Sequence, residues 1–64
     1  MGLNLKIARI KKGLTQKQLA EIVGTSPATI NKAEKGKIDI RIGTLKKISK
    51  ALGVSISELI EDEQ

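Results

Sequence analysis

The chain has 64 residues, which fits one small domain, and its lack of Cys, His and aromatic residues excludes disulfides and the commonest catalytic base and nucleophile. Its net charge of +5 is unevenly distributed, because residues 1–50 hold all twelve basic residues and three acidic ones, whereas residues 51–64 hold four acidic residues and no basic one. A basic body with an acidic tail favours either a polyanionic partner such as nucleic acid or simply a solvated lysine-rich surface.

The sequence also lacks the features of membrane proteins, exported proteins and enzymes. No apolar stretch approaches the roughly 20 residues of a membrane span. The first residues carry dispersed charges without a small-residue cleavage site, and no glycine-rich loop follows a strand pattern. We therefore expect a cytoplasmic protein that is not an enzyme, has no contact with a membrane and binds neither a cofactor nor a metal.

The first predicted element is a helix over residues 3–12, which Gly13 ends. Leu5 and Ala8 share one face of this helix and are expected to point toward the core. A second apolar row consists of Leu3, Ile7 and Ile10. This second row either packs against the C-terminal helix or contacts another protein.

Residues 15–36 predict two short helices joined by a tight turn. Thr15 is a good N-cap, and Gln18 completes a capping-box pattern for a helix over residues 16–23. Gly24 ends this helix, because the left-handed backbone conformation needed there suits glycine. The inward face of the helix consists of Leu19, Ala20 and Val23.

Ser26 caps the second helix of this pair, and Pro27 occupies its first position, where a missing N–H group costs nothing. This helix is expected to cover residues 27–35 and to end at Gly36. Its inward residues are Ile30 and Ala33. The other positions face outward to different degrees: Ala28, Thr29, Asn31, Lys32 and Lys35.

The rest of the chain predicts a loop and two further helices. Residues 37–41 alternate like a short strand, but no other segment could pair with them, so we expect a loop. A helix over residues 42–52 has an inward row made of Ile42, Leu45, Ile48 and Leu52. Ser55 and Glu58 form a capping-box pattern for a last helix that begins at Ile56. The apolar side of that helix consists of Leu59 and Ile60.

Two segments carry a family resemblance, GLTQKQLAEIVGTSPATINKAEKG and TLKKISKALGVSISELI. With them the chain resembles, from about residue 5 to residue 60, the helix-turn-helix domains of the phage repressor/Cro type, also called the XRE family. The resemblance implies an all-α, compact five-helix domain of the lambda-repressor-like DNA-binding type over residues 1–64. It places the helix-turn-helix at about residues 15–36, and we expect the acidic residues 61–64 to be frayed.

The resemblance also implies a function. In such domains the second helix of the helix-turn-helix lies in the major groove of double-stranded DNA, and the first lies across the phosphates. We therefore expect a sequence-specific transcriptional regulator, most simply a repressor. Two alternatives stay open: an antitoxin or adaptor whose main partner is a protein bound through Leu3, Ile7 and Ile10, and a DNA-binding fragment of a longer repressor.

Several residues are candidates for contacts to the DNA backbone. Helix N-termini present free N–H groups and the positive end of the helix dipole, which suits phosphate, and the resemblance implies such a contact for Gln16. The further candidates are basic: Lys17, Lys35, Lys37 and Arg41. A solvated basic surface is the alternative role for these four side chains.

The helix that the resemblance assigns to DNA reading offers few long polar side chains. Its leading edge consists of Ser26, Pro27 and Ala28. Lys32 is expected to donate to guanine O6 and N7, while thymine methyl groups are expected to contact Pro27, Ala28 and the Thr29 methyl group. Asn31 either pairs with adenine or reaches a phosphate. Relatives often carry long polar residues at positions 27 and 28, so specificity here rests on Lys32, methyl contacts and DNA shape.

The resemblance implies a structural role for two charged residues. Arg9 and Glu34 match a pair that forms a partly buried ion pair in these domains. The alternative role for Glu34 is that of a catalytic acid. A single carboxylate without a partner base or metal ligand does not support that role, so we expect a structural pair.

Two apolar residues in the loop after the reading helix bear on assembly. Family members usually carry Pro where this chain has Ile40, and Ile38 is also apolar in a loop that should be exposed. In relatives this region forms a two-fold contact, so we expect a homodimer on a near-palindromic operator. The candidate contact residues are Ile38, Ile40, Val54 and Ile56. The alternative is that these residues complete a small core.

Overall fold

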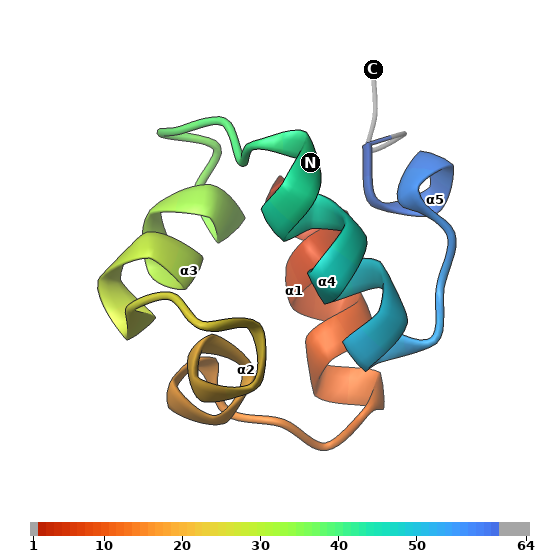
Figure 1. The fold of residues 1–64 in the computed structure, drawn as a ribbon, viewed down its shortest axis with the longest axis horizontal. Helices are drawn as coiled ribbons and strands as arrows, with labels where there is room; N and C mark the ends of the chain where they lie inside the picture. The colour runs from red at the N-terminus through yellow and green to blue at the C-terminus, as the bar shows by residue number, and fades with distance from the viewer. Residues whose placement is uncertain (1, 61–64) are drawn as a thin grey trace.

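The structure is a computed structural model that describes residues 2–60, and these residues form five α-helices and no strand. The helices are α1 (Gly2–Lys11), α2 (Gln16–Val23), α3 (Pro27–Glu34), α4 (Ile42–Leu52) and α5 (Ile56–Ile60), arranged as in Figure 1. This confirms the predicted all-α fold class, and the predicted helix boundaries agree within one residue. The predicted fraying of residues 61–64 and the side chain of Leu3 lie outside the described part of the chain.

Local hydrogen bonds set where the helices begin. The Thr15 hydroxyl accepts from the Gln18 backbone N–H at 3.0 Å, and the Gln18 side-chain oxygen accepts from the Thr15 N–H at 2.9 Å. Ser55 and Glu58 exchange the same two bonds at the start of α5, at 3.2 and 2.9 Å. Both predicted capping boxes are therefore present, and each satisfies N–H groups that the first helical turn leaves without a partner.

The turn between α2 and α3 depends on one glycine. Gly24 has a φ of 78°, in the left-handed region that suits glycine. The N–H groups of Gly24 and Thr25 both donate to the Ala20 carbonyl, each at 2.9 Å, so the turn satisfies an otherwise unpaired carbonyl. Ser26 then accepts from the Thr29 N–H at 3.1 Å and starts α3 with Pro27 at its first position.

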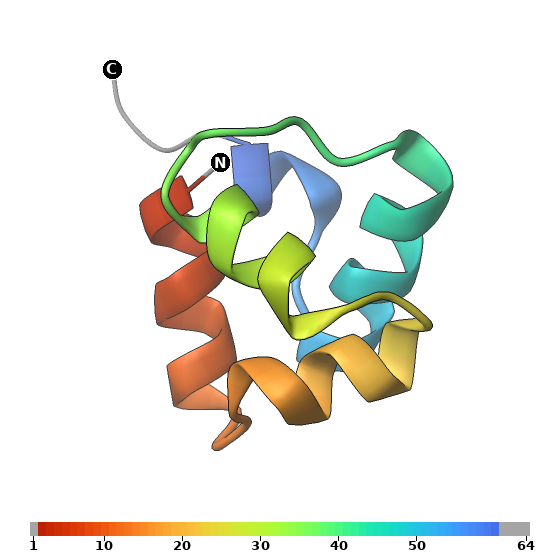
Figure 2. The same ribbon diagram turned by 90° about the vertical axis from the view of Figure 1, so that its left-hand side faces the viewer.

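One aliphatic core joins all five helices among the described residues. Its fully buried members include Leu5 of α1, Leu19 of α2, Ile30 of α3, Ile48 of α4 and Leu59 of α5. Ala20 and Ala33 are also fully buried, which lets α2 and α3 approach closely. Figure 2 shows the result, with α3 lying across the front of the molecule above α2. The core therefore holds the inner side of α3 and leaves its other side open.

Two residues that were expected in the core lie on the surface instead. Ile42 is 61% exposed and Ile60 is 52% exposed. Ile42 is the first residue of α4, at the edge of the row formed by Leu45 and Ile48, where none of the other four described helices covers it. In the short α5, Leu59 takes the inward position, so the neighbouring Ile60 points about 100° away from it.

No helix in residues 2–60 has the length and apolar character that a membrane span requires.

Candidate nucleic-acid interface

The outer side of α3 is the most accessible part of the helix-turn-helix segment. Pro27, Ala28, Lys32 and Lys35 are exposed, while Ile30 and Ala33 on the opposite side are fully buried. This division follows from the helical period, because about 100° separates successive residues and places 28, 32 and 35 on one side. The predicted outward face of α3 is therefore present, and among the described residues no side chain buries its tip.

The polar residues at the start of α3 are partly engaged with each other. Ser26 is exposed and serves as the N-cap, and its hydroxyl lies 2.9 Å from the Thr29 hydroxyl. Thr29 and Asn31 are half-buried and lie on opposite flanks of the exposed side. The exposed residues on this side of α3 are thus apolar or basic.

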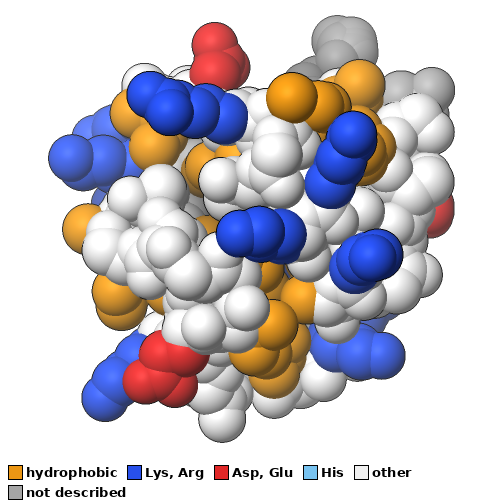
Figure 3. Space-filling view, in the orientation of Figure 1, with side chains coloured by type: hydrophobic (Ala, Val, Ile, Leu, Met, Phe, Trp, Pro, Cys, Tyr) orange, Lys and Arg blue, Asp and Glu red, His pale blue; other side chains and the backbone are white. Residues whose placement is uncertain are grey.

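Basic side chains surround this face. Lys17 at the start of α2 is exposed, as are Lys35, Lys37 and Arg41 after α3. Figure 3 shows Lys and Arg side chains spread over the face that Figure 1 presents, in which α3 lies at the left, with acidic side chains toward the edges of the view. Of the basic residues in the described part of the chain, only Arg9 forms a salt bridge. The other cations are therefore free to attract a polyanion.

Arg9 and Glu34, which the resemblance pairs, lie together behind α3. The Arg9 Nε and Nη2 atoms donate to the two carboxylate oxygens of Glu34 at 2.5 and 3.2 Å. The Arg9 Nη1 atom donates to the Leu14 carbonyl at 2.7 Å. The side chains are only 11% and 4% exposed, so this is a nearly buried bidentate pair that ties α1 to the end of α3.

Sequence reasoning missed a contact that involves two of the candidate DNA-binding residues. Gln16 Nε2 donates to Glu34 Oε1 at 3.0 Å, and Asn31 Nδ2 donates to Gln16 Oε1 at 3.4 Å. These residues belong to different helices, so no local pattern in the sequence connects them. The contact brings the start of α2 and one flank of α3 into a single polar cluster with Arg9 and Glu34.

The candidate dimer residues divide between surface and core. Ile38 is 37% exposed. Ile40, Val54 and Ile56 are half-buried and pack against the core cluster. Most of this apolar set therefore rests against the core of one molecule, and Ile38 is its most accessible member.

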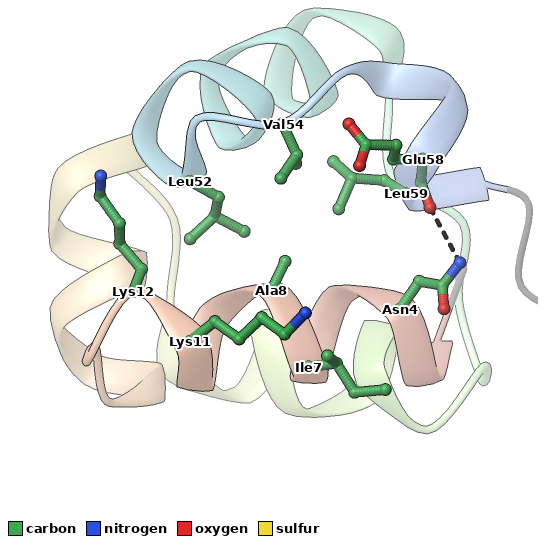
Figure 4. Close-up of a pocket in the computed structure, with 9 residues that line it drawn as sticks. All are labelled: Asn4, Ile7, Ala8, Lys11, Lys12, Leu52, Val54, Glu58 and Leu59. Carbon is green, nitrogen blue, oxygen red and sulfur yellow. Dashed lines mark hydrogen bonds between the residues drawn. The ribbon is translucent and has the colours of Figure 1, made fainter.

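A groove of about 450 Å³ lies on another part of the surface, between α1 and the α4–α5 region (Figure 4). Ala8, Leu52, Val54 and Leu59 point into it, and a hydrogen bond of 2.8 Å from Asn4 to the Glu58 carbonyl crosses one end. Ile7 lies at its rim and is 41% exposed, and Ile10 is 56% exposed. Two members of the second apolar row of α1, Ile7 and Ile10, are thus exposed in the described part of the chain.

Two short helices, a left-handed glycine between them and an outward second helix together define a helix-turn-helix protein. The chain belongs to the helix-turn-helix family, because the profile of that family, described as "Helix-turn-helix", matches residues 5–59. This confirms the resemblance seen in the sequence. Since the family and the relatives below are DNA-binding transcriptional regulators, the prediction that the chain is not an enzyme is also confirmed.

Several curated relatives are similar over nearly the whole chain. The transcriptional regulator PuuR of Escherichia coli is 33% identical over 63 residues, which cover 98% of this chain and 34% of PuuR. The transcriptional activator BcrR of Enterococcus faecalis is 41% identical over 66 residues, which cover 100% of this chain and 32% of BcrR. The chain thus spans about a third of the length of these two relatives.

A third relative has nearly the same length as this chain. It is an uncharacterised helix-turn-helix transcriptional regulator of Methanocaldococcus jannaschii, 40% identical over 62 residues that cover 94% of each protein. Among solved structures, the restriction-modification controller protein C.AhdI of Aeromonas hydrophila matches with a TM-score of 0.84 and 29% identity. The match covers 92% of this chain and 89% of the controller protein, which agrees with the expected lambda-repressor-like fold.

Proposed function

We propose that the chain is a sequence-specific transcriptional regulator that places α3 in the major groove of double-stranded DNA. The observation that carries this proposal is the open outer side of α3, which is rigidly held from beneath by Ile30 and Ala33. The names of the relatives support regulation of transcription. We further propose that it acts in the cytoplasm as a repressor, because occupying an operator is enough to block transcription.

The outward residues divide into base readers and backbone contacts. Lys32 has an exposed ammonium group that suits guanine O6 and N7, and Pro27 and Ala28 offer apolar surface, together with the Thr29 methyl group, to thymine methyl groups. Gln16 and Ser26 lie at the starts of α2 and α3, where phosphates are attracted. The proposed backbone cations are Lys17, Lys35, Lys37 and Arg41. Because so few hydrogen bonds reach bases, DNA shape must supply part of the specificity.

Lys32→Ala is expected to change which DNA sequences bind. Losing the donor to guanine should cost about 1–3 kcal/mol at one base pair and relax the preference there. The measurement is selection of bound duplexes from a random pool with the unaltered chain and with the variant. Lys37→Ala is the matched control, and it should weaken all duplexes equally and lower the salt slope by about one. If Lys32→Ala also weakened all duplexes equally, the base-reading role of Lys32 would be wrong.

We also propose a homodimer that binds two half-sites of a near-palindromic operator about one helical turn apart. The candidate contact residues are Ile38, Ile40, Val54 and Ile56, and Ile38 is the most exposed of them. Ile38→Lys should then shift sedimentation equilibrium toward monomer and leave thermal stability of the monomer nearly unchanged, because the side chain is already partly exposed. A chain that sediments as a monomer at high concentration, and binds one copy per operator, would contradict the dimer.

A second candidate function is that of an antitoxin or adaptor whose main partner is another protein. The observation that favours it is the groove between α1 and the α4–α5 region together with the exposed Ile7 at its rim and the exposed Ile10 three residues further along α1. Apolar residues gathered beside a groove are a common feature of surfaces that bind proteins. The side chain of Leu3, the third member of this row, is not among those described.

A further inference from the structure

The polar cluster behind α3 forms a chain of hydrogen bonds that crosses three helices. It runs from Arg9 on α1 to Glu34 at the end of α3, then to Gln16 at the start of α2, and returns to α3 at Asn31. Glu34 Oε1 is the shared atom, since it accepts from Arg9 Nη2 at 3.2 Å and from Gln16 Nε2 at 3.0 Å. The nearly buried ion pair is therefore linked directly to Gln16 and, through Gln16, to Asn31, which are two of the proposed DNA contacts.

The chemistry of the groups fixes the direction of every bond in this chain. A carboxylate can only accept, so Gln16 must turn its NH₂ group toward Glu34. That orientation leaves the Gln16 carbonyl oxygen facing Asn31, and an oxygen can be satisfied only by the NH₂ group of Asn31. Each amide retains a second N–H bond that these interactions do not use. The charge on Glu34 thus determines which way two amides point.

The position of Asn31 separates it from Lys32. Asn31 is half-buried on the flank of α3 that faces the start of α2, whereas Lys32 is exposed about 100° further round. The flank of Asn31 adjoins the N-terminus of α2, where Gln16 lies and where phosphate is favoured. Asn31 therefore lies with the backbone contact rather than with the base reader.

We propose that Glu34 is a positioning residue for DNA binding, and that Gln16 and Asn31 act as one unit on the DNA backbone. Glu34 orients the Gln16 amide, which in turn orients Asn31, and the free N–H bonds of both amides then meet phosphate oxygens. Because the amides are already ordered in the free protein, binding does not have to immobilise them. This inference rests on the proposed DNA-binding function and resolves the two alternatives for Asn31 in favour of phosphate.

The test is a double-mutant cycle in DNA affinity with Gln16→Ala, Asn31→Ala and the variant that carries both. Each single change should weaken binding by between about twofold and about tenfold, because one ordered amide is lost and the other is freed. The double variant should bind within about twofold of the weaker single variant, since residues that act as a unit are not additive. The duplexes selected from a random pool should be the same for all three variants, because no base contact is removed.

A parallel cycle with Lys37→Ala serves as the control. Lys37 shares no hydrogen bond or salt bridge with the four linked residues, so its effect should multiply with that of Gln16→Ala. Glu34→Gln tests whether the Glu34 charge orients the two amides. It should weaken DNA binding of the folded protein, but it should cause no further loss of affinity in a protein that already carries Gln16→Ala. If Glu34→Gln fails to fold, the cycle between Gln16 and Asn31 still decides the matter.

Three outcomes would overturn the inference or its foundation, and they differ from one another. If the fold-losses of DNA affinity from Gln16→Ala and Asn31→Ala multiply in the double variant, as those of Gln16→Ala and Lys37→Ala should, the two amides do not act as a unit. If Asn31→Ala changes the preferred base at one position of the selected duplexes, Asn31 reads a base instead. If the unaltered chain selects no duplex above the level of non-specific binding, the proposed function itself fails.

Discussion

Arg9→Ala is expected to lower the free energy of unfolding by about 3 kcal/mol, because the Glu34 carboxylate would be left almost buried without its cation. The Leu14 carbonyl would also lose the donor that reaches it at 2.7 Å. A single core in a domain of this size rarely supplies more than about 3–5 kcal/mol in total. The variant should therefore keep only about 0–2 kcal/mol of stability at room temperature. Circular dichroism during urea titration measures the change.

A charge-removal control and a double variant distinguish the contribution of the Arg9–Glu34 pair to stability from the general effect of removing one charge. Lys6→Ala removes an exposed cation from the same helix and should change stability by less than about 0.5 kcal/mol. Arg9→Met combined with Glu34→Leu removes both charges and should recover much of the loss, since apolar pairs of similar volume often replace buried ion pairs well. An Arg9→Ala variant as stable as Lys6→Ala would show that the buried pair contributes nothing.

Ile30→Ala is expected to lower the free energy of unfolding by about 2–5 kcal/mol, because it opens a cavity where α3 rests on the core. Ile30 is fully buried, and its loss would also loosen the helix that we propose to read DNA. Two matched controls carry the same change at exposed isoleucines, Ile22→Ala at 59% exposure and Ile42→Ala at 61% exposure. Both should lie within about 0.5 kcal/mol of the unaltered chain.

Thermal unfolding of the three variants provides the measurement. The Ile42 control also tests the position of this residue, because the sequence pattern of α4 predicts it in the core whereas the structure places it on the surface. A large loss of stability in Ile42→Ala, or a negligible one in Ile30→Ala, would contradict the core described here.

The sequence was sufficient to predict the helices because the signals that start and stop them are local. Thr15 with Gln18, and Ser55 with Glu58, form their capping bonds within three residues. Gly24 has the left-handed conformation that its place after a helix predicts. Features of this kind depend on neighbours in the chain and not on the rest of the fold, so they can be read without a structure.

Burial at the ends of helices could not be predicted in the same way. Ile42 and Ile60 fit the apolar period of their helices, yet both are exposed because no other element within residues 2–60 covers them. Ile40, Val54 and Ile56 had two possible roles, and only tertiary packing shows that each rests against the core. Periodicity predicts which side of a helix is apolar, whereas the burial of that side depends on which helix packs against it.

The candidate DNA-binding site likewise has some features that the local sequence predicts and others that depend on tertiary packing. The helical period identifies the outward residues of α3, because inward and outward positions follow from the spacing alone. The contact between Gln16 and Asn31 depends on how α2 crosses α3, and residues fifteen positions apart give no sign of it in the sequence. The roles of these residues on DNA stay predictions that the variants above would test.

Titrating a selected duplex into isotopically labelled protein, and following each backbone amide by NMR, tests the central claim most directly. We expect the largest shifts at the outward residues of α3 and at Gln16 and Lys17, with little change at Ile7, Ile10 and the groove beside α5. Shifts confined to that groove, with α3 unchanged, would show that this helix does not meet DNA and that the surface of α1 is the binding site instead.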